Sequence, residues 1–139
     1  MGWFDTLLNR LFPSEEKDDY EEQFGSMPPD DGSPKTSNVY VVELRRDALI
    51  DSIFEGQTAH RAEHNGECFY VGMTGLTPEE RFRNHVRGIR ASRIVKKYGR
   101  RLRPELYEHL NPMTRKQAEY MEPKLAHDLR QQGHAVHQN

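Results

Sequence analysis

Hydrophobic and polar positions divide the chain into a short amphipathic start, a polar stretch and one longer patterned region. Apolar residues at helical spacing predict a short amphipathic helix over residues 1–12, which Pro13 ends. Residues 13–37 are rich in Pro, Gly, Ser, Asp and Glu, which predicts a disordered acidic linker with almost nothing to bury. Residues 38–139 are therefore expected to form a single domain.

Within that domain, β-branched and aromatic runs predict strands at residues 39–44 and 68–72. A long polar insertion, residues 45–66, separates them. Capping signals and apolar spacing predict three helices and one further strand: helices at 78–89, 91–98 and 114–131, and a strand at 102–110. The first of these helices is expected to bury an apolar stripe of Phe82, Val86 and Ile89. Three strands with helices packed on them predict a compact α+β fold.

Composition narrows the class of protein. Charged residues make up 30% and hydrophobic residues 35% of the chain, so little apolar material is available for a core. The single cysteine, Cys68, excludes a disulfide framework and a zinc site built from several cysteines, and it favours a reducing, cytoplasmic location. No apolar run approaches the ~18 residues of a transmembrane segment, and no secretion signal is expected at the N-terminus.

The net charge of −2 hides an uneven distribution. Residues 1–37 hold three basic and nine acidic residues, whereas residues 38–139 hold 17 basic and 13 acidic ones. Ten basic residues and no acidic one lie between Arg81 and Arg103. A solvated surface usually mixes both signs, so this density favours a polyanionic partner such as nucleic acid.

The candidate nucleic-acid contacts are the basic side chains of the two helices in this stretch: Arg83, Arg87, Arg90, Arg93, Lys96 and Lys97. Arg83, Arg87 and Arg90 follow i, i+4, i+7 spacing and are expected to share one helix face.

Five residues could carry chemistry, although none is specific alone. Tyr40 and Tyr70 lie on predicted strands, where tyrosines are usually core residues with the hydroxyl at the rim. Arg81 and His85 are four residues apart and share one helix face. Glu122 borders apolar positions of the last helix, where a single carboxylate is more often a salt-bridge partner than a metal ligand. Spacing alone therefore leaves structural and catalytic roles open.

Taken together, these residues resemble the GIY-YIG nuclease superfamily. The resemblance spans residues 38–139 and is carried by short motifs in a specific order: Val39-Tyr40, Tyr70-Val71-Gly72, Arg81, His85 and Glu122. It implies a small three-stranded antiparallel sheet flanked by helices, and the activity of a DNA endonuclease.

The resemblance also implies a role for each site residue. Tyr40 or Tyr70 would help to deprotonate the attacking water. Arg81 would stabilise the charge that builds on the phosphate, and His85 would assist or orient. Glu122 would hold one magnesium or manganese ion near the leaving oxygen, because magnesium takes much of its shell from water and phosphate.

The chain departs from the family pattern in four places. Asn38 stands where the first motif has glycine, and the insertion between the motif strands is long. Many family members also have an asparagine near the end of the domain, and none is assigned here. Pro123 directly follows Glu122, and an interior proline costs about 3 kcal/mol and kinks a helix. That kink puts the aim of the Glu122 side chain in question.

Three functions stay open at this point. The first is a metal-dependent DNA endonuclease, for which branched, nicked and site-specific DNA and also RNA remain open as substrates. The second is a nucleic-acid-binding module of the same fold that does not cut. The third is a partner-recruited interaction protein, in which residues 1–12 dock on another protein and the acidic linker tethers the domain.

Overall fold

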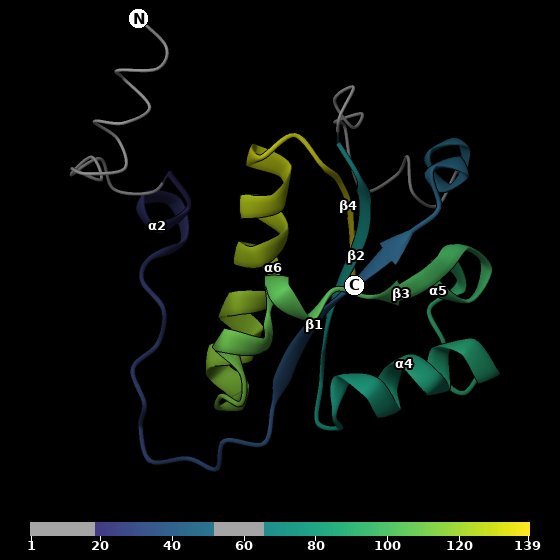
Figure 1. Ribbon diagram of the computed structural model, residues 1–139. Helices are drawn as coiled ribbons and strands as arrows, with labels where there is room; N and C mark the ends of the chain where they lie inside the picture. Colours follow the sequence, from purple (N-terminus) through teal and green to yellow (C-terminus); the bar gives the residue numbers. More distant parts are fainter. Residues whose placement is uncertain (1–18, 52–65) are drawn as a thin grey trace, which may run out of the picture.

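The computed structural model describes residues 19–51 and 66–139. The predicted helix at residues 1–12 and most of the insertion, residues 52–65, lie outside these ranges. The helices and strands are α2 (Asp19–Phe24), β1 (Asn38–Leu44), β2 (Cys68–Thr74), α4 (Pro78–Arg87), α5 (Arg93–Tyr98), β3 (Gly99–Leu102), α6 (Arg115–Gln131) and β4 (Ala135–Gln138). The sheet lies between α6 on one side and α4 with α5 on the other (Figure 1).

The sheet has four strands in the order β3-β1-β2-β4, which is one more than predicted. β1 pairs antiparallel with β2 and with β3, whereas β2 pairs parallel with β4. The expectation of an α+β fold is confirmed, but that of a purely antiparallel, three-stranded sheet is wrong. The additional strand is only four residues long, and so short a run carries little periodic signal.

The third strand lies earlier in the chain than the predicted 102–110. Gly99–Leu102 pairs with β1, and Pro104 instead begins the first of two short 3-10 turns, η2 (Pro104–Leu106) and η3 (Glu108–Leu110). Edge strands with exposed arginines lack the apolar alternation that identifies a half-buried strand. Proline lacks the N–H that a strand ladder needs.

Capping signals locate the starts of the two longer helices well. The Thr77 hydroxyl accepts a hydrogen bond from the Glu80 N–H at 3.1 Å, and α4 begins directly after it. Thr114 and Gln117 make both bonds of a capping box at the start of α6. These bonds satisfy backbone donors that a helix start otherwise leaves open.

The end of α4 differs from the prediction. Gly88 adopts a φ of 82° and ends the helix after Arg87, so Ile89 and Arg90 lie in the following loop. Arg90 therefore does not share a helix face with the other two arginines. The expected apolar stripe is confirmed only at Phe82, which packs against the core, because Val86 and Ile89 are 58% and 51% exposed.

The predicted linker at residues 13–37 is described only from residue 19 on, and there it contacts the domain. Tyr20 of α2 is 7% exposed, and its ring packs against Tyr120 and His127 of α6 at centroid distances of 5.6 and 5.4 Å. The Tyr120 hydroxyl donates to the Gly25 carbonyl at 2.8 Å. In Figure 1, α2 accordingly lies on the outer side of α6. One aromatic anchor in an acidic stretch is too sparse a pattern to predict this docking.

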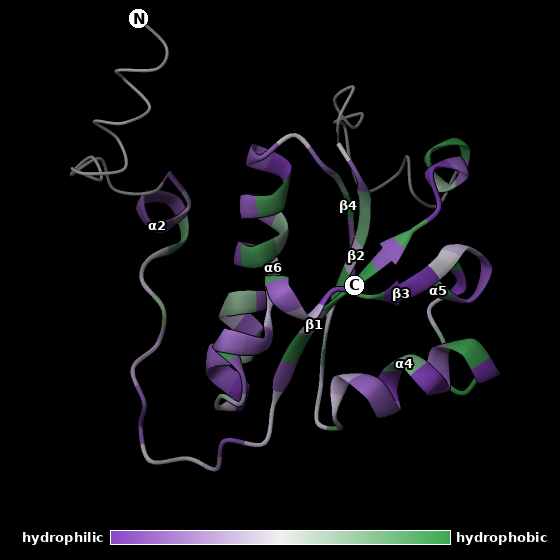
Figure 2. Cartoon of the chain, in the orientation of Figure 1, coloured by the Kyte–Doolittle hydropathy of each residue, from purple (hydrophilic) through white to green (hydrophobic). Residues whose placement is uncertain are grey.

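The helix α6 runs unbroken through Pro123. Apolar residues alternate with polar ones along it (Figure 2), and its buried positions include Ala118, Leu125 and Leu129 together with Glu122. None of the helices in the described ranges has the length and apolar character that crossing a bilayer demands.

Candidate active site

The two candidate tyrosines lie on the same face of the sheet. The register pairs Tyr40 with Gly72 and Val42 with Tyr70, which makes the tyrosines diagonal neighbours. Their ring centroids are 6.1 Å apart. Gly72 leaves the space that the Tyr40 ring fills, since a Cβ there would lie 2.7 Å from the Tyr40 hydroxyl oxygen. The glycine of the second motif is therefore required by the tyrosine of the first.

The helix α4 brings His85 onto these tyrosines. His85 Nε2 lies 2.8 Å from the Tyr40 oxygen, and its ring centroid lies 5.7 Å from that of Tyr70. On the other side of the imidazole, the Ser92 N–H donates to Nδ1 at 2.9 Å. Because Nδ1 accepts this bond, a neutral His85 carries its proton on Nε2 and donates it to Tyr40.

His85 is poorly suited to accept a second proton. Burial lowers its pKa to about 4, and the charge of Arg81 acts in the same direction. A proton added to Nδ1 would also face the Ser92 N–H. Of the two roles expected for His85, assisting or orienting, the geometry favours orientation of the Tyr40 hydroxyl.

Both phenols are buried. Tyr40 and Tyr70 are each 1% exposed, and burial raises the pKa of each above its usual value, while the charge of Arg81 opposes this rise. The two hydroxyls are therefore neutral near pH 7. A tyrosine in this position can act as a base only if further positive charge stabilises its phenolate.

Arg81 is held at the edge of an open cavity. Its guanidinium donates to the carbonyls of Arg90 at 2.9 Å and Ile89 at 3.4 Å, in the loop after α4. This loop turns at Arg90 itself, with a φ of 48°. The cavity measures about 600 Å³ and is lined by Thr74, Leu76, Arg81, Asn84, Ile89 and Arg90.

Glu122 reaches the sheet where β4 stops. The Val71 carbonyl accepts a bond from the Asn139 N–H at 3.1 Å. Alternate residues of a strand direct their backbone groups to the same edge. Met73 therefore presents its N–H on the edge of β2 that pairs with β4, and this N–H donates a hydrogen bond to the Glu122 carboxylate. Glu122 is 8% exposed, and burial raises its pKa to about 7.

The Glu122 carboxylate has no ion-pair partner among residues 19–51 and 66–139. Sequence spacing favoured a salt-bridge role, which the structure does not supply within these ranges. The charge of Glu122 also raises the pKa of Tyr70, so the two groups lie close enough to interact. A buried carboxylate without a cation is an unfavourable arrangement unless a metal ion or a proton neutralises it.

The donor set near Glu122 fits an ion only in a limited way. The described part of the chain contains no group of three or more His, Cys, Asp or Glu residues that could hold a metal. One buried carboxylate can still suffice for magnesium, which keeps several waters and takes further oxygens from a phosphate. Glu122 therefore fits a site for one ion whose remaining ligands come from the substrate. Without substrate, such a site would bind the metal only weakly.

A second cavity shares the lining residue Thr74 with the cavity beside Arg81. The second measures about 380 Å³ and is lined by Thr36, Ser37, Met73, Thr74, Gly75 and Arg115. Thr74 lines both, and Met73 carries the N–H that binds Glu122. A phosphate near Thr74 would thus lie by Arg81 in the first cavity and by Met73, the backbone partner of Glu122, in the second.

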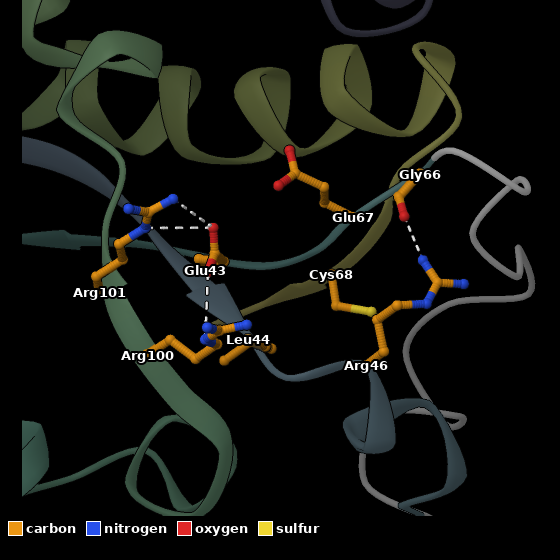
Figure 3. Close-up of a pocket in the computed structure, with 8 residues that line it drawn as sticks. All are labelled: Glu43, Leu44, Arg46, Gly66, Glu67, Cys68, Arg100 and Arg101. Carbon is orange, nitrogen blue, oxygen red and sulfur yellow. Dashed lines mark hydrogen bonds and ion pairs between the residues drawn. The ribbon is translucent and has the colours of Figure 1, made fainter.

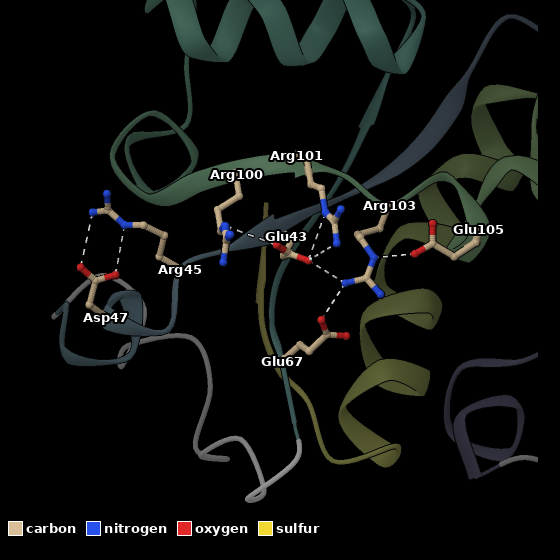
Figure 4. A network of polar contacts seen from close by, with 8 residues as sticks. All are labelled: Glu43, Arg45, Asp47, Glu67, Arg100, Arg101, Arg103 and Glu105. Atoms are coloured by element: carbon tan, nitrogen blue, oxygen red, sulfur yellow. Dashed lines mark hydrogen bonds and ion pairs between the residues drawn. The ribbon is translucent and has the colours of Figure 1, made fainter.

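The basic stretch between Arg81 and Arg103 divides into two groups. Arg100, Arg101 and Arg103 pair with Glu43 at 3.5, 3.3 and 2.8 Å, as Figure 4 shows. Arg103 also binds Glu67 at 2.7 Å. These partners are distant in sequence, so part of the apparent positive charge serves to hold β3 on β1.

Among the predicted nucleic-acid contacts, Lys97 belongs to the paired group, since it lies 3.6 Å from Asp51. The other five are exposed and form no ion pair within the described ranges: Arg83, Arg87, Arg90, Arg93 and Lys96. Arg90 also lines the cavity beside Arg81. The available positive charge is therefore concentrated on α4, its following loop and α5.

A further cavity of about 290 Å³ lies near the ends of β1 and β2 that are far from Thr74 (Figure 3). Its carboxylates, Glu43 and Glu67, are already bound by arginines. Burial raises the pKa of the Cys68 thiol, which disfavours the reactive thiolate. This cavity therefore offers less chemistry than the one beside Arg81.

Two residues that the sequence analysis missed help to build the site. Ser92 fixes the proton position on His85. The Asn111 amide both accepts from the Val39 N–H at 2.9 Å and donates to the Val39 carbonyl at 2.8 Å, which holds β1 next to Tyr40. Asn111 has no local signal in the sequence, because its partner is 72 positions away.

The structure thus gathers Tyr40, Tyr70, Arg81 and His85, with Glu122 at the adjoining sheet edge. Comparisons of this chain with models of protein families, with curated proteins and with solved structures found no match. A function therefore has to be inferred from these residues themselves.

Proposed function

We propose that this chain is a metal-dependent DNA endonuclease of the GIY-YIG type, which hydrolyses a phosphodiester bond between Arg81 and Glu122. The observation that supports this most is the buried carboxylate of Glu122, which has no ion-pair partner in the described ranges and whose charge, like that of Arg81, acts on Tyr70. Structural carboxylates are normally paired when buried, so one without an ion-pair partner among the described residues suggests a functional site.

Each residue has a distinct task in the proposed reaction. Arg81 stabilises the negative charge that builds on the phosphate, and the carbonyls that bind its guanidinium keep it preorganised. Tyr40 is oriented by His85 and would contact the attacking water once the site opens to it, since its hydroxyl is buried in this conformation. Tyr70 packs beside Tyr40 and His85. The charge of Glu122 raises the pKa of the Tyr70 hydroxyl.

Glu122 would hold the magnesium or manganese ion, with Thr74 and Gly75 lining the approach. When bound, such an ion neutralises charge on the phosphate and on the leaving oxygen. Protein side chains contribute one carboxylate in this arrangement, so ion binding is expected to be weak without DNA and stronger with it.

One observation favours a second candidate, a nucleic-acid-binding module of the same fold that does not cut. Tyr40 and Tyr70 are each 1% exposed, so neither hydroxyl meets solvent readily in this conformation. The exposed cations around Arg87 and Arg90 would bind DNA in either case. The two candidates differ in whether product forms and whether it depends on Glu122.

The test is cleavage of supercoiled plasmid, nicked duplex and branched duplex with magnesium or manganese. Glu122→Gln is expected to abolish product while leaving metal-free DNA binding largely intact, and Arg81→Gln is expected to abolish product and to weaken binding as well. Glu119→Gln is the matched control on α6, because Glu119 is exposed and pairs only with Arg115 within the described ranges. Cleavage that persists in Glu122→Gln at the wild-type rate would exclude this mechanism. Binding without any product would support the non-cutting module.

A further inference from the structure

The cavity beside Arg81 is lined in part by apolar side chains, which binding of a phosphate does not require. Leu76 and Ile89 both line it and are 42% and 51% exposed, so they present apolar surface to solvent in the same cavity as Arg81. Asn84 also lines it, and its side-chain amide has no hydrogen-bond partner in the part of the chain that the structure describes. Two apolar side chains and one amide thus share this cavity with the Arg81 guanidinium.

These features match a nucleobase better than a sugar–phosphate backbone. A base has two apolar faces and a polar edge that can both donate and accept hydrogen bonds. An asparagine amide also offers a donor and an acceptor side by side. The volume of about 600 Å³ lies within the range of pockets that enclose small organic groups.

We propose that this cavity takes an unpaired nucleobase next to the phosphate bound by Arg81, with its faces against Leu76 and Ile89 and its edge on Asn84. The substrate class would then be DNA with an unpaired base beside the cut, such as a bulge, a flap or a junction. This inference rests on the proposed function, since it assigns the neighbour of the same phosphate.

The preference for an unpaired base follows from the energy of extrusion. A base inside a continuous duplex must lose its stacking and pairing before it can enter a side pocket, which costs a few kcal/mol. A base in a bulge or flap has lost its partner already. Apolar side chains that enter DNA at such weak steps are a recurring feature of proteins that deform it.

The experiment uses two duplexes of the same sequence, one continuous and one with a single bulged 2-aminopurine, in metal-free buffer with EDTA. The full-length wild-type protein is expected to bind the bulged duplex more tightly and to raise the fluorescence as the probe leaves the stack. Ile89→Ser and Leu76→Ser are expected to weaken bulge binding about tenfold and binding to the continuous duplex much less. Asn84→Ala is expected to act similarly.

The matched control is Val86→Ser. Val86 is 58% exposed and lies on α4, but it does not line the cavity, so this variant should retain the wild-type preference. Equal affinity for both duplexes would overturn the inference, as would an equal loss in the control. A third result would also overturn the inference. If the protein self-associates and Ile89→Ser abolishes this self-association without changing DNA binding, the apolar side chains form a protein interface.

The metal-free readout separates this inference from the proposed function. Cleavage that depends on Glu122 but shows no preference for the bulged duplex would support the proposed endonuclease and contradict the proposed nucleobase pocket. Bulge preference without any metal-dependent product would support the pocket and count against the endonuclease.

Discussion

Replacing Glu122 by glutamine should stabilise the metal-free protein at alkaline pH. Burial raises the pKa of Glu122 from 4.5 to about 7, against a smaller opposing effect of the Met73 backbone hydrogen bond. Glutamine has nearly the same shape and keeps an oxygen for that bond, but it never ionises. The variant therefore removes the energetic penalty of a buried charge while it removes the proposed metal ligand.

The magnitude follows from proton linkage. Each pKa unit corresponds to about 1.4 kcal/mol, so ionised Glu122 destabilises the folded state by about 3 kcal/mol. Between the two pKa values the folded state holds the proton and the unfolded state does not, so stability falls as pH rises. The loss grows from about pH 4.5 and levels off above pH 7. About 2 kcal/mol of this loss in stability occurs between pH 5.5 and 8.5.

The assay is urea denaturation of wild type and Glu122→Gln at several pH values in this window, with EDTA. Groups shared by both proteins cancel in the difference, so the advantage of the variant should grow by about 2 kcal/mol from pH 5.5 to 8.5. Manganese should then reduce that advantage at pH 8.5, because only the wild type binds the ion. A difference that does not change with pH would refute the claim that this carboxylate is buried and unpaired.

Three further outcomes are expected. Gly72→Ala should destabilise the protein by about 1–3 kcal/mol in chemical denaturation, because its Cβ would lie 2.7 Å from the Tyr40 oxygen, whereas an unchanged midpoint would show that the ring moves freely. Arg87→Gln should weaken DNA binding and lower the salt slope by about 1 in fluorescence anisotropy, whereas Arg101→Gln should do less, since Arg101 already pairs with Glu43. Tyr20→Ala should cost about 3 kcal/mol in thermal or chemical unfolding, and no cost would mean that α2 does not dock in solution.

Periodicity and capping predicted the parts of the fold that are encoded locally. The strands at Val39–Leu44 and Cys68–Gly72 follow from β-branched and aromatic runs, and the helix starts follow from Thr77 and Thr114. β4 and α2 were missed, and β3 was placed too late in the chain, because each is short and is held by partners far along the chain. β3 depends on Glu43, and α2 depends on side chains of α6.

Charge counting along the sequence overestimated the nucleic-acid surface for the same reason. Between Arg81 and Arg103 no acidic residue is near in sequence, yet Glu43 lies against three of the arginines in space. The same stretch places Arg90 beside Arg81 because Gly88 ends α4 early. A run of basic residues therefore predicts a polyanionic partner only if enough of them lack acidic partners from distant parts of the chain.

The position of the Tyr40 hydroxyl depends on residues from four separate segments. Asn111 holds the neighbouring backbone of β1, Gly72 of β2 leaves room for the ring, and His85 of α4 binds the oxygen. His85 in turn can only donate, because Ser92 occupies its other nitrogen. Each short motif is unspecific on its own, since a tyrosine or a glycine in a strand is common. Their combination is restrictive, because changing any one residue alters the space or the hydrogen bond that another requires. This mutual dependence is the physical reason why the order and spacing of the motifs carry more information than the motifs themselves.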